Sequence, residues 1–205
     1  MKEIILWISS FFALLISLFW MQVMYFKDEK SELIERYPKV SIVIPAYNEA
    51  ETISRTINSV LSLDYPKDKI EIIVVDDSST DNTSSVVKKF RQVKLIYNKH
   101  RGLGKASALN AGLRYATGEF FAVVDADSEV KEDSLKNIMR YFDDKKVGSV
   151  ISSIKITNPK NIYHHIQRLE YILATFIRKL MSKIDTLHIT PGVLSVYKTD
   201  LIKKL

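Results

Sequence analysis

The sequence predicts an α/β domain in which helices flank a mostly parallel sheet, preceded by one transmembrane helix. Ile4–Phe26 contains no charged residue, which indicates the transmembrane helix. From Val40 onward, short β-branched runs alternate with segments of helical periodicity. Ile70–Val75 is nearly all apolar, as a strand buried on both faces should be. An alternation of this kind predicts a parallel sheet with helices on both faces.

The composition excludes several classes of protein. The 205 residues are 46% hydrophobic, which excludes disordered and low-complexity chains because enough apolar side chain is present to fill a core. The absence of cysteine excludes a disulfide framework, a zinc–cysteine site and a thiol nucleophile. The net charge of +6 suits an anionic partner. No nucleic-acid partner is predicted, because Lys and Arg are spread out without an aromatic–basic recognition motif.

The first element is a membrane anchor over residues 1–27. A helix as long as Ile4–Phe26 reaches about 35 Å, enough for a hydrocarbon core of about 30 Å. Trp7 lies near one end and Trp20 and Tyr25 near the other, as in aromatic interface belts. A cleaved signal peptide would have a shorter apolar run and a small-x-small cleavage site, and a buried core helix is rarely apolar on every face.

Flanking charge predicts the orientation of this helix. Lys2 is the only basic side chain before the span, whereas four follow it closely: Lys27, Lys30, Arg36 and Lys39. The positive-inside rule then places the rest of the chain in the cytoplasm, attached to the cell membrane by a single span. Residues 28–39 are charged and are predicted to form a juxtamembrane linker to a domain over residues 40–205.

The remaining elements follow in alternating order. Strands are predicted at Val40–Ile44, Ile70–Val75, Val93–Tyr97, Phe120–Val124 and Gly148–Ile154. Helices are predicted at Glu49–Leu63, Thr80–Phe90, Leu103–Ala116 and Lys131–Phe142. Ser79 or Thr80 is expected to cap the second of these helices. Pro159–Leu187 is an amphipathic stretch of one or two helices, which either packs on the sheet or lays its basic apolar face on the membrane.

Polar clusters follow three of the predicted strands. They are Pro45–Glu49, Asp76–Thr83 and Asp125–Asp127. In an open parallel sheet, ligands bind outside the carboxyl ends of the strands, so these clusters are expected at one edge. Carboxylates gathered there repel one another unless a cation lies among them, and hard oxygen ligands suit Mg²⁺ or Mn²⁺.

Asn98–Gly112 is the remaining candidate for ligand binding. It is not a Walker A motif, which would need Gly at Lys99 and Ser or Thr at Ala106. The pattern predicts instead a basic turn followed by a helix, whose amino end and Lys105 can face an anionic ligand.

Four motifs in this order resemble the family 2 glycosyltransferases, which have a nucleotide-binding GT-A fold. The motifs are Val40–Glu49, Val74–Thr83, Gly104–Gly112 and Val124–Asp127, and the resemblance covers about residues 38–205. Two further stretches resemble the membrane polysaccharide-synthase branch, related to cellulose and hyaluronan synthases. These are Gln167–Tyr171 and Thr190–Tyr197.

The resemblance implies a set of site residues. Nucleotide-sugar binding is expected from Pro45, Tyr47, Glu49, Asp76 or Asp77, Lys105, Asn110 and Asp125. Asp127 is expected to coordinate the metal and, with Asp125, to form the catalytic pair; Thr190, Pro191 and Gly192 would border the acceptor. A metal on Asp127 and the cation of Lys105 would stabilise the charge that develops on the leaving diphosphate.

The sequence departs from the family pattern at the general base. In this family the base is an Asp in a Glu-Asp pair after the acceptor-side loop, but after Gly192 only Asp200 is acidic, in a stretch that does not match. Further membrane helices and the Gln-x-x-Arg-Trp motif are also missing. We therefore expect a C-terminally incomplete chain that binds nucleotide-sugar with metal but transfers sugar poorly, unless a membrane partner subunit supplies the rest.

The function expected from these features is a membrane-anchored, inverting, metal-dependent glycosyltransferase. Its donor would be a nucleotide-diphosphate sugar, with a UDP-sugar preferred, and its acceptor a saccharide or a lipid-linked molecule. Two alternatives remain open at this point: a polyprenyl-phosphate sugar transferase, and a catalytically incomplete nucleotide-sugar-binding membrane subunit.

Overall fold

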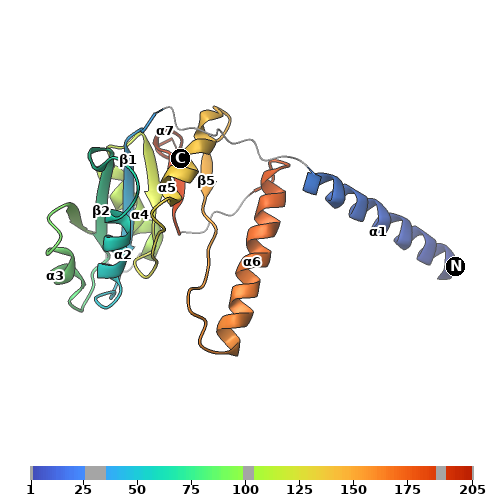
Figure 1. Cartoon of the computed structure of the whole chain (residues 1–205), viewed down its shortest axis with the longest axis horizontal. Helices are drawn as coiled ribbons and strands as arrows, with labels where there is room; N and C mark the ends of the chain where they lie inside the picture. The colour runs from blue at the N-terminus through green and yellow to red at the C-terminus, as the bar shows by residue number, and fades with distance from the viewer. Residues whose placement is uncertain (1, 26–35, 99–103, 188–192, 205) are drawn as a thin grey trace. The chain divides into compact units, whose positions relative to one another are not determined.

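The computed structural model describes residues 2–25, 36–98, 104–187 and 193–204, which belong to two compact units (Figure 1). One unit comprises Met1–Glu29 and Ser153–Ile189. The other comprises Lys30–Ser152 and Thr190–Leu205 and contains the sheet.

The sheet unit contains six strands in the order β3-β2-β1-β4-β6-β5. The strands are β1 (Val40–Ala46), β2 (Ile70–Asp76), β3 (Val93–Tyr97), β4 (Phe120–Val123), β5 (Ser149–Ile151) and β6 (Ser195–Lys198). β3, β2, β1 and β4 pair in parallel, whereas β6 pairs antiparallel with both β4 and β5. The expected mostly parallel α/β sheet is confirmed; β6 was not predicted.

The helices are generally shorter than the sequence patterns suggest. They are α2 (Ile53–Leu61), α3 (Thr83–Val87), α4 (Gly104–Tyr115), α5 (Ser134–Met139) and α7 (Thr199–Ile202), with short 3₁₀ turns at Lys67–Lys69 and Arg140–Asp143. The expected cap of α3 is wrong. Asn82 occupies the cap position and makes no side-chain cap hydrogen bond, while Ser79 and Thr80 both contact Asn48.

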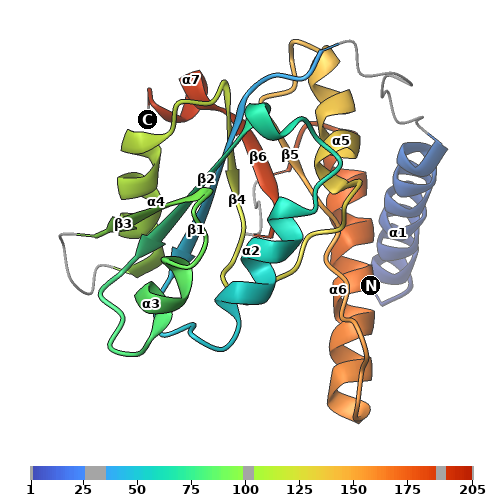
Figure 2. The same ribbon diagram turned by 60° about the vertical axis from the view of Figure 1, so that its left-hand side comes forward.

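Alternating side chains of the strands pack on different helices. On one face, Ile42, Ile44 and Val74 share a cluster with residues of α2, α3 and α5. On the other face, Val43 and Val75 cluster with Ala108 of α4. Figure 2 shows α4 and α2 on opposite sides of the strands. The sheet is therefore covered on both faces, which explains the continuous apolar runs of its central strands.

Gly112 sets how closely α4 approaches the sheet. A Cβ atom at this position would lie 2.5 Å from Cγ1 and 3.1 Å from Cγ2 of Val43, so only glycine fits without displacement. This close approach holds α4, and with it Lys105 in its first turn, against β1 and β2.

A polar network ties the amino ends of the strands together. The Oε2 atom of Glu71 accepts hydrogen bonds from the Ser41 hydroxyl and from the backbone N–H of Thr117 (2.9 Å). The N–H of Gly118 donates to Ser41 Oγ (2.8 Å). Burial by itself would raise the pKa of Glu71, but the hydrogen bonds from Ser41 and Thr117 lower it below its ordinary value.

The other unit contains two long helices, α1 (Lys2–Tyr25) and α6 (Ile162–Ser182). Of the described helices, α1 alone is long and apolar enough to cross a membrane. No residue of α6 is buried. The two expected roles of this amphipathic stretch, packing on the sheet or lying on the membrane, both stay predictions.

Candidate functional site

The three polar segments expected to form the site follow the carboxyl ends of neighbouring parallel strands. Ala46 at the end of β1 pairs with Asp76 at the end of β2. Val43 of β1 pairs with Val123, the last residue of β4. Backbone hydrogen bonding continues one residue beyond the ends of β2 and β4. The N–H of Asp77 donates to the carbonyl of Ala46 (2.9 Å), and the N–H of Val124 donates to the carbonyl of Val43 (3.1 Å). The expectation that all three segments lie at one edge of the sheet is confirmed.

Asp76 and Asp77 are both buried but have different neighbours. Oδ1 of Asp76 accepts the N–H of Ser79 (2.8 Å), and Oδ2 accepts the hydroxyl of Ser84 in α3. Oδ1 of Asp77 accepts from the side-chain amide of Asn98 (2.7 Å), which also donates to Ser107 Oγ in α4 (3.0 Å). Asp76 thus holds the loop after β2, whereas Asp77 links β2 to the end of β3 and to α4.

The loops after β1 and β2 are joined by reciprocal hydrogen bonds. The N–H of Asn48 donates to Ser79 Oγ (3.0 Å), and Asn48 Oδ1 accepts from the N–H of Thr80 (2.8 Å). Asn48 and Ser78 both have positive φ, +55° and +68°, a conformation that the loop geometry requires of them. The shared edge of these loops is predictable from the sequence, but their pairing is not, since it joins residues about thirty positions apart.

Glu49 and Asp81 add further hydrogen bonds between the segments that follow β1 and β2. The N–H of Glu49 donates to Thr83 Oγ1 (2.8 Å), while Asp81 accepts from the N–H of Ala50 (3.0 Å) and from Thr83. The hydrogen bonds from Thr83 lower the pKa of Asp81 below its ordinary value. The Glu49 carboxylate accepts the hydroxyl of Thr52 within its own turn.

Lys105 and Asp125 form an ion pair that joins α4 to the loop after β4. Both side chains remain partly exposed, so they can reach a bound anion and its counter-ion. The carbonyl of Ala126 accepts the buried hydroxyl of Thr56 in α2 (2.8 Å), which fixes the turn between Asp125 and Asp127. The sequence patterns did not identify Thr56 as a support of this turn.

Asp127 is the most accessible carboxylate of this turn. It is exposed and accepts the hydroxyl of the adjacent Ser128 (3.1 Å), and no Lys or Arg among the described residues pairs with it. Within the described ranges, no group of three or more His, Asp and Glu could hold a metal ion. Mg²⁺ is commonly bound by one or two carboxylates and completes its shell with substrate phosphates and water, and the exposed Asp127 carboxylate is chemically compatible with such a ligand role.

The other expected residues differ in how far the structure describes them. Pro45 is half-buried within β1, and Tyr47 and Asn110 are exposed, without a hydrogen-bond partner among the described residues. The acceptor-side residues Thr190, Pro191 and Gly192 lie outside the described residues. Their expected role stays a prediction.

The end of β3 contributes residues that the sequence analysis missed. Tyr97 is the register partner of Asp76, and Lys88 lies 5.9 Å from the centre of its ring. Hydrogen bonding by Ser84 and Lys88 lowers the pKa of Tyr97 from its ordinary value. Strand pairing places Tyr97 beside the acidic segments. The sequence of β3 alone does not indicate which strand it pairs with.

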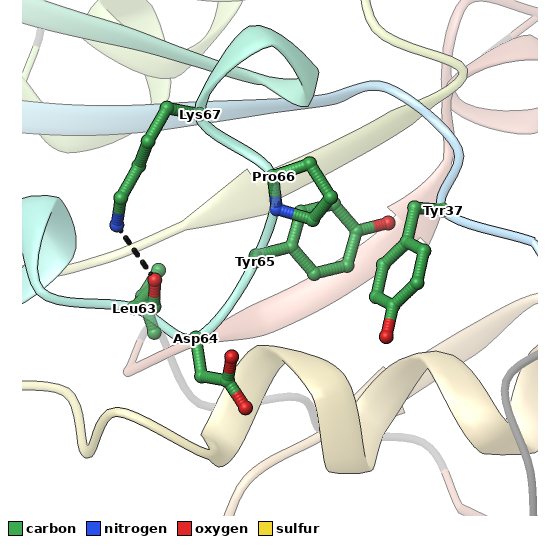
Figure 3. Close-up of a pocket in the computed structure, with 6 residues that line it drawn as sticks. All are labelled: Tyr37, Leu63, Asp64, Tyr65, Pro66 and Lys67. Carbon is green, nitrogen blue, oxygen red and sulfur yellow. Dashed lines mark hydrogen bonds between the residues drawn. The ribbon is translucent and has the colours of Figure 1, made fainter.

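A hollow of about 400 Å³ lies at the opposite edge of the sheet. Its lining consists of Tyr37, before β1, and of the residues leading into β2: Leu63, Asp64, Tyr65, Pro66 and Lys67 (Figure 3). The Tyr65 hydroxyl donates to the carbonyl of Pro38 (2.8 Å), and burial raises the pKa of Tyr65 above its ordinary value. Because no acidic strand end reaches this hollow, we assign the candidate site to the carboxyl edge instead.

Comparison with known proteins identifies the class of protein. The sequence profile described as Glycosyl transferase family 2 matches residues 41–205, so the chain belongs to this family. A probable glycosyltransferase of Bacillus subtilis, YdaM, is 32% identical over 186 residues, which is 85% of this chain and 44% of that protein. A poly-β-1,6-N-acetyl-D-glucosamine synthase of Staphylococcus epidermidis is 33% identical over 172 residues, 80% of this chain and 40% of that protein.

Solved structures share the same fold. The mannosyltransferase PcManGT of Pyrobaculum calidifontis, in complex with GDP-Man and Mn²⁺, superposes with a TM-score of 0.75 and 30% identity over 93% of this chain and 53% of that one. TarS of S. aureus (residues 1–349), in complex with UDP-GlcNAc, gives 0.62 and 25% identity over 81% of this chain and 47% of that one. The chain spans half or less of the length of the curated relatives named above.

Proposed function

We propose that this chain carries the donor-binding part of a membrane-anchored, inverting glycosyltransferase that uses a nucleotide-diphosphate sugar. The observation that carries the proposal is the convergence of Asp77, Asp125 and Asp127 at the carboxyl edge of a family 2 fold, beside Lys105. A UDP-sugar is our preferred donor, because TarS was solved with UDP-GlcNAc. The GDP-Man complex of PcManGT makes a GDP-sugar the alternative to be tested.

Each site residue has a proposed task. Asp77 and Asn98 form a buried, hydrogen-bonded wall for the nucleoside, and Lys105 leaves Asp125 to face the diphosphate. Asp127 is proposed to hold Mg²⁺ or Mn²⁺. When bound, that ion neutralises the charge that develops on the leaving diphosphate. Attack by an acceptor hydroxyl from the opposite side of the anomeric carbon inverts its configuration.

The proton of the acceptor hydroxyl needs a base. Asp200 does not fit this task, because β6 runs antiparallel to β4 and carries Asp200, in α7, to the amino edge of the sheet. The N–H of Thr199 donates to Glu119 (3.0 Å) and its hydroxyl to Gly118 (2.8 Å), which fixes α7 there. Asp200 is therefore left out of the proposed catalytic role, and we keep as a second candidate function a nucleotide-sugar-binding membrane subunit.

We further propose that α1 spans the cell membrane and that the sheet unit lies in the cytoplasm. The length and apolar character of α1 support the span. The excess of basic residues after the helix supports the orientation. The acceptor is proposed to be a saccharide or a lipid-linked molecule, since several relatives are named as polysaccharide synthases.

Titration calorimetry of the detergent-solubilised chain tests donor binding. UDP-, GDP- and TDP-sugars are titrated with and without Mn²⁺ into the wild type, Asp127→Ala and the matched control Asp68→Ala, an exposed Asp at the amino edge. A charge-assisted contact contributes about 1.5–3 kcal/mol, so Asp127→Ala should weaken Mn²⁺-dependent binding by roughly tenfold to a hundredfold. Asp68→Ala should bind like the wild type. Equal affinity in all three proteins would show that Asp127 does not take part in donor binding.

Acceptor-dependent turnover separates the two candidate functions. A transferase releases UDP from a UDP-sugar faster when a saccharide or lipid-linked acceptor is added, whereas a binding subunit does not. For the chain alone we expect donor binding with little acceptor-dependent release. Rapid polymer synthesis by the purified chain would contradict this expectation.

A further inference from the structure

Helix α6 lies in the segment that connects two neighbouring strands of the sheet, β5 and β6. Ile151 of β5 and Ser195 of β6 are register partners, so the chain leaves the sheet after β5 and returns beside it. Asn161 caps the helix by accepting the N–H of His164 (2.9 Å). Among the described helices, only α1 is long and apolar enough to be a candidate membrane span.

The large apolar residues of α6 are mostly exposed. With 3.6 residues per turn, its large apolar residues fall on one side of the helix, and the following seven are between 42% and 66% exposed. They are Ile162, Ile166, Leu169, Ile172, Leu173, Phe176 and Ile177. Of the half-buried residues, Tyr171, Thr175 and Arg178 lie on the opposite side, whereas Leu180 lies on the apolar side. Most of the large apolar residues of α6 are therefore exposed.

The charge of α6 complements an anionic surface. Arg168, Arg178 and Lys179 are its basic residues, and Glu170 is its one acidic residue. At 100° per residue, Arg168 and Lys179 border the apolar side along one flank. Glu170 borders the other flank. A helix with an exposed apolar side and a basic flank is typical of proteins that lie in the interface of an anionic membrane. Pairing with a second copy of the same helix would instead bring like charges together.

We propose that α6 lies in the plane of an anionic lipid surface, with its Leu169 side at the boundary between headgroups and acyl chains. The surface would be the leaflet on the side of the sheet unit. This inference does not depend on the proposed transfer reaction, because it concerns a lipid contact of α6 that binding of a nucleotide-sugar does not require.

Single-cysteine labelling of the full chain tests the lipid contact. Because the chain has no native cysteine, Leu169→Cys and the control Gln167→Cys, exposed on the polar side, can each carry one environment-sensitive fluorophore. The labelled chains are reconstituted into vesicles of phosphatidylcholine with phosphatidylglycerol that also contain spin-labelled lipids. We expect a blue-shifted emission with strong lipid quenching at position 169 and aqueous emission without quenching at position 167.

Two results would overturn the proposal. Aqueous emission at both positions would mean that the apolar side stays out of the bilayer. A blue shift at position 169 without quenching by lipid would mean that protein, such as a second copy, covers it. Calorimetry of the same labelled chains with UDP reports the nucleotide site separately, so loss of one property is distinguishable from loss of the other.

A charge-removal series tests the preference for anionic lipid. Arg168→Gln/Lys179→Gln in the Leu169→Cys background should lower quenching on anionic vesicles by about half or more and leave it unchanged on pure phosphatidylcholine. The matched control is Lys89→Gln/Arg91→Gln, which removes two exposed cations of the sheet unit and should change neither value. Unchanged quenching in the first variant would overturn the anionic assignment.

Discussion

At the scale of single residues, Asp76 and Asp127 show that carboxylates at one sheet edge serve different tasks. Asp76 is buried and both of its oxygens accept hydrogen bonds from the loop that it supports. Asp127 is exposed and contacts only the neighbouring Ser128 among the described residues. Their environments indicate that Asp76 stabilises the fold and that Asp127 remains accessible to a ligand.

This difference predicts opposite outcomes for the same substitution. Asp76→Asn loses an acceptor for a buried hydrogen bond and should lower the free energy of unfolding by about 1–3 kcal/mol. Asp127→Asn should change it by less than about 0.5 kcal/mol, as expected for an exposed site. Denaturant unfolding in detergent micelles measures both. A larger loss for Asp127→Asn than for Asp76→Asn would contradict the assignment.

Lys105 offers a second test at this scale. Its ion pair with Asp125 is partly exposed and contributes about 0–1 kcal/mol to stability, so Lys105→Gln should fold normally. If Lys105 faces the diphosphate, the variant should bind UDP about tenfold more weakly while binding of uridine stays unchanged. Lys69→Gln, at the amino edge, is the matched control. Parallel losses for UDP and uridine would show that Lys105 does not act on the phosphates.

At the scale of elements, the strands were the most predictable part. β3 has the predicted bounds, and the first residue of β1, β2 and β4 was predicted correctly, because buried parallel strands are marked by apolar runs. β6 was missed because an antiparallel strand of four residues is defined by its partners β4 and β5 rather than by its own pattern. α3 begins later than expected because Ser79 and Thr80 bond to Asn48 and do not cap a helix.

The candidate site, like the elements, is only partly predictable from the sequence. The position of the acidic segments at one edge is predictable from the sequence, since parallel strand ends share an edge. The hydrogen bonds of Asn48 with Thr80 and of Asp77 with Asn98 are not predictable in this way, because they join residues distant in sequence. Tyr97 and Thr56 enter the site region through strand register and helix packing, which local patterns do not report.

The polar network at the amino edge predicts a pH dependence of stability. The pKa of Glu71 is lowered in the folded chain, so its contribution is present above the unfolded value of about 4.5 and is lost as the pH falls through the lower folded value. The stability difference between the wild type and Glu71→Gln should therefore be largest near pH 7 and shrink below about pH 4.5. Unfolding curves at several pH values measure this difference. A difference that grows on acidification would contradict the network.

At the scale of the whole molecule, the chain combines three surfaces of different chemistry. The sheet unit offers an acidic edge with Lys105, α1 is an apolar helix of spanning length, and α6 exposes apolar residues bordered on one flank by Arg168 and Lys179. A family 2 transferase that acts at a membrane needs a donor site, an anchor and a surface that meets the lipid. These three features together motivate the proposed function.

The central claim is that the carboxyl edge of the sheet binds a metal–nucleotide complex. Diffraction from crystals of the chain grown with UDP and Mn²⁺ tests it most directly, through the anomalous signal of manganese. We predict a manganese peak in direct coordination with the Asp127 carboxylate, with the UDP diphosphate on the same ion and Asp77 beside the nucleoside. A nucleotide bound in the hollow lined by Tyr37 and Tyr65, or a manganese peak away from Asp127, would contradict the claim.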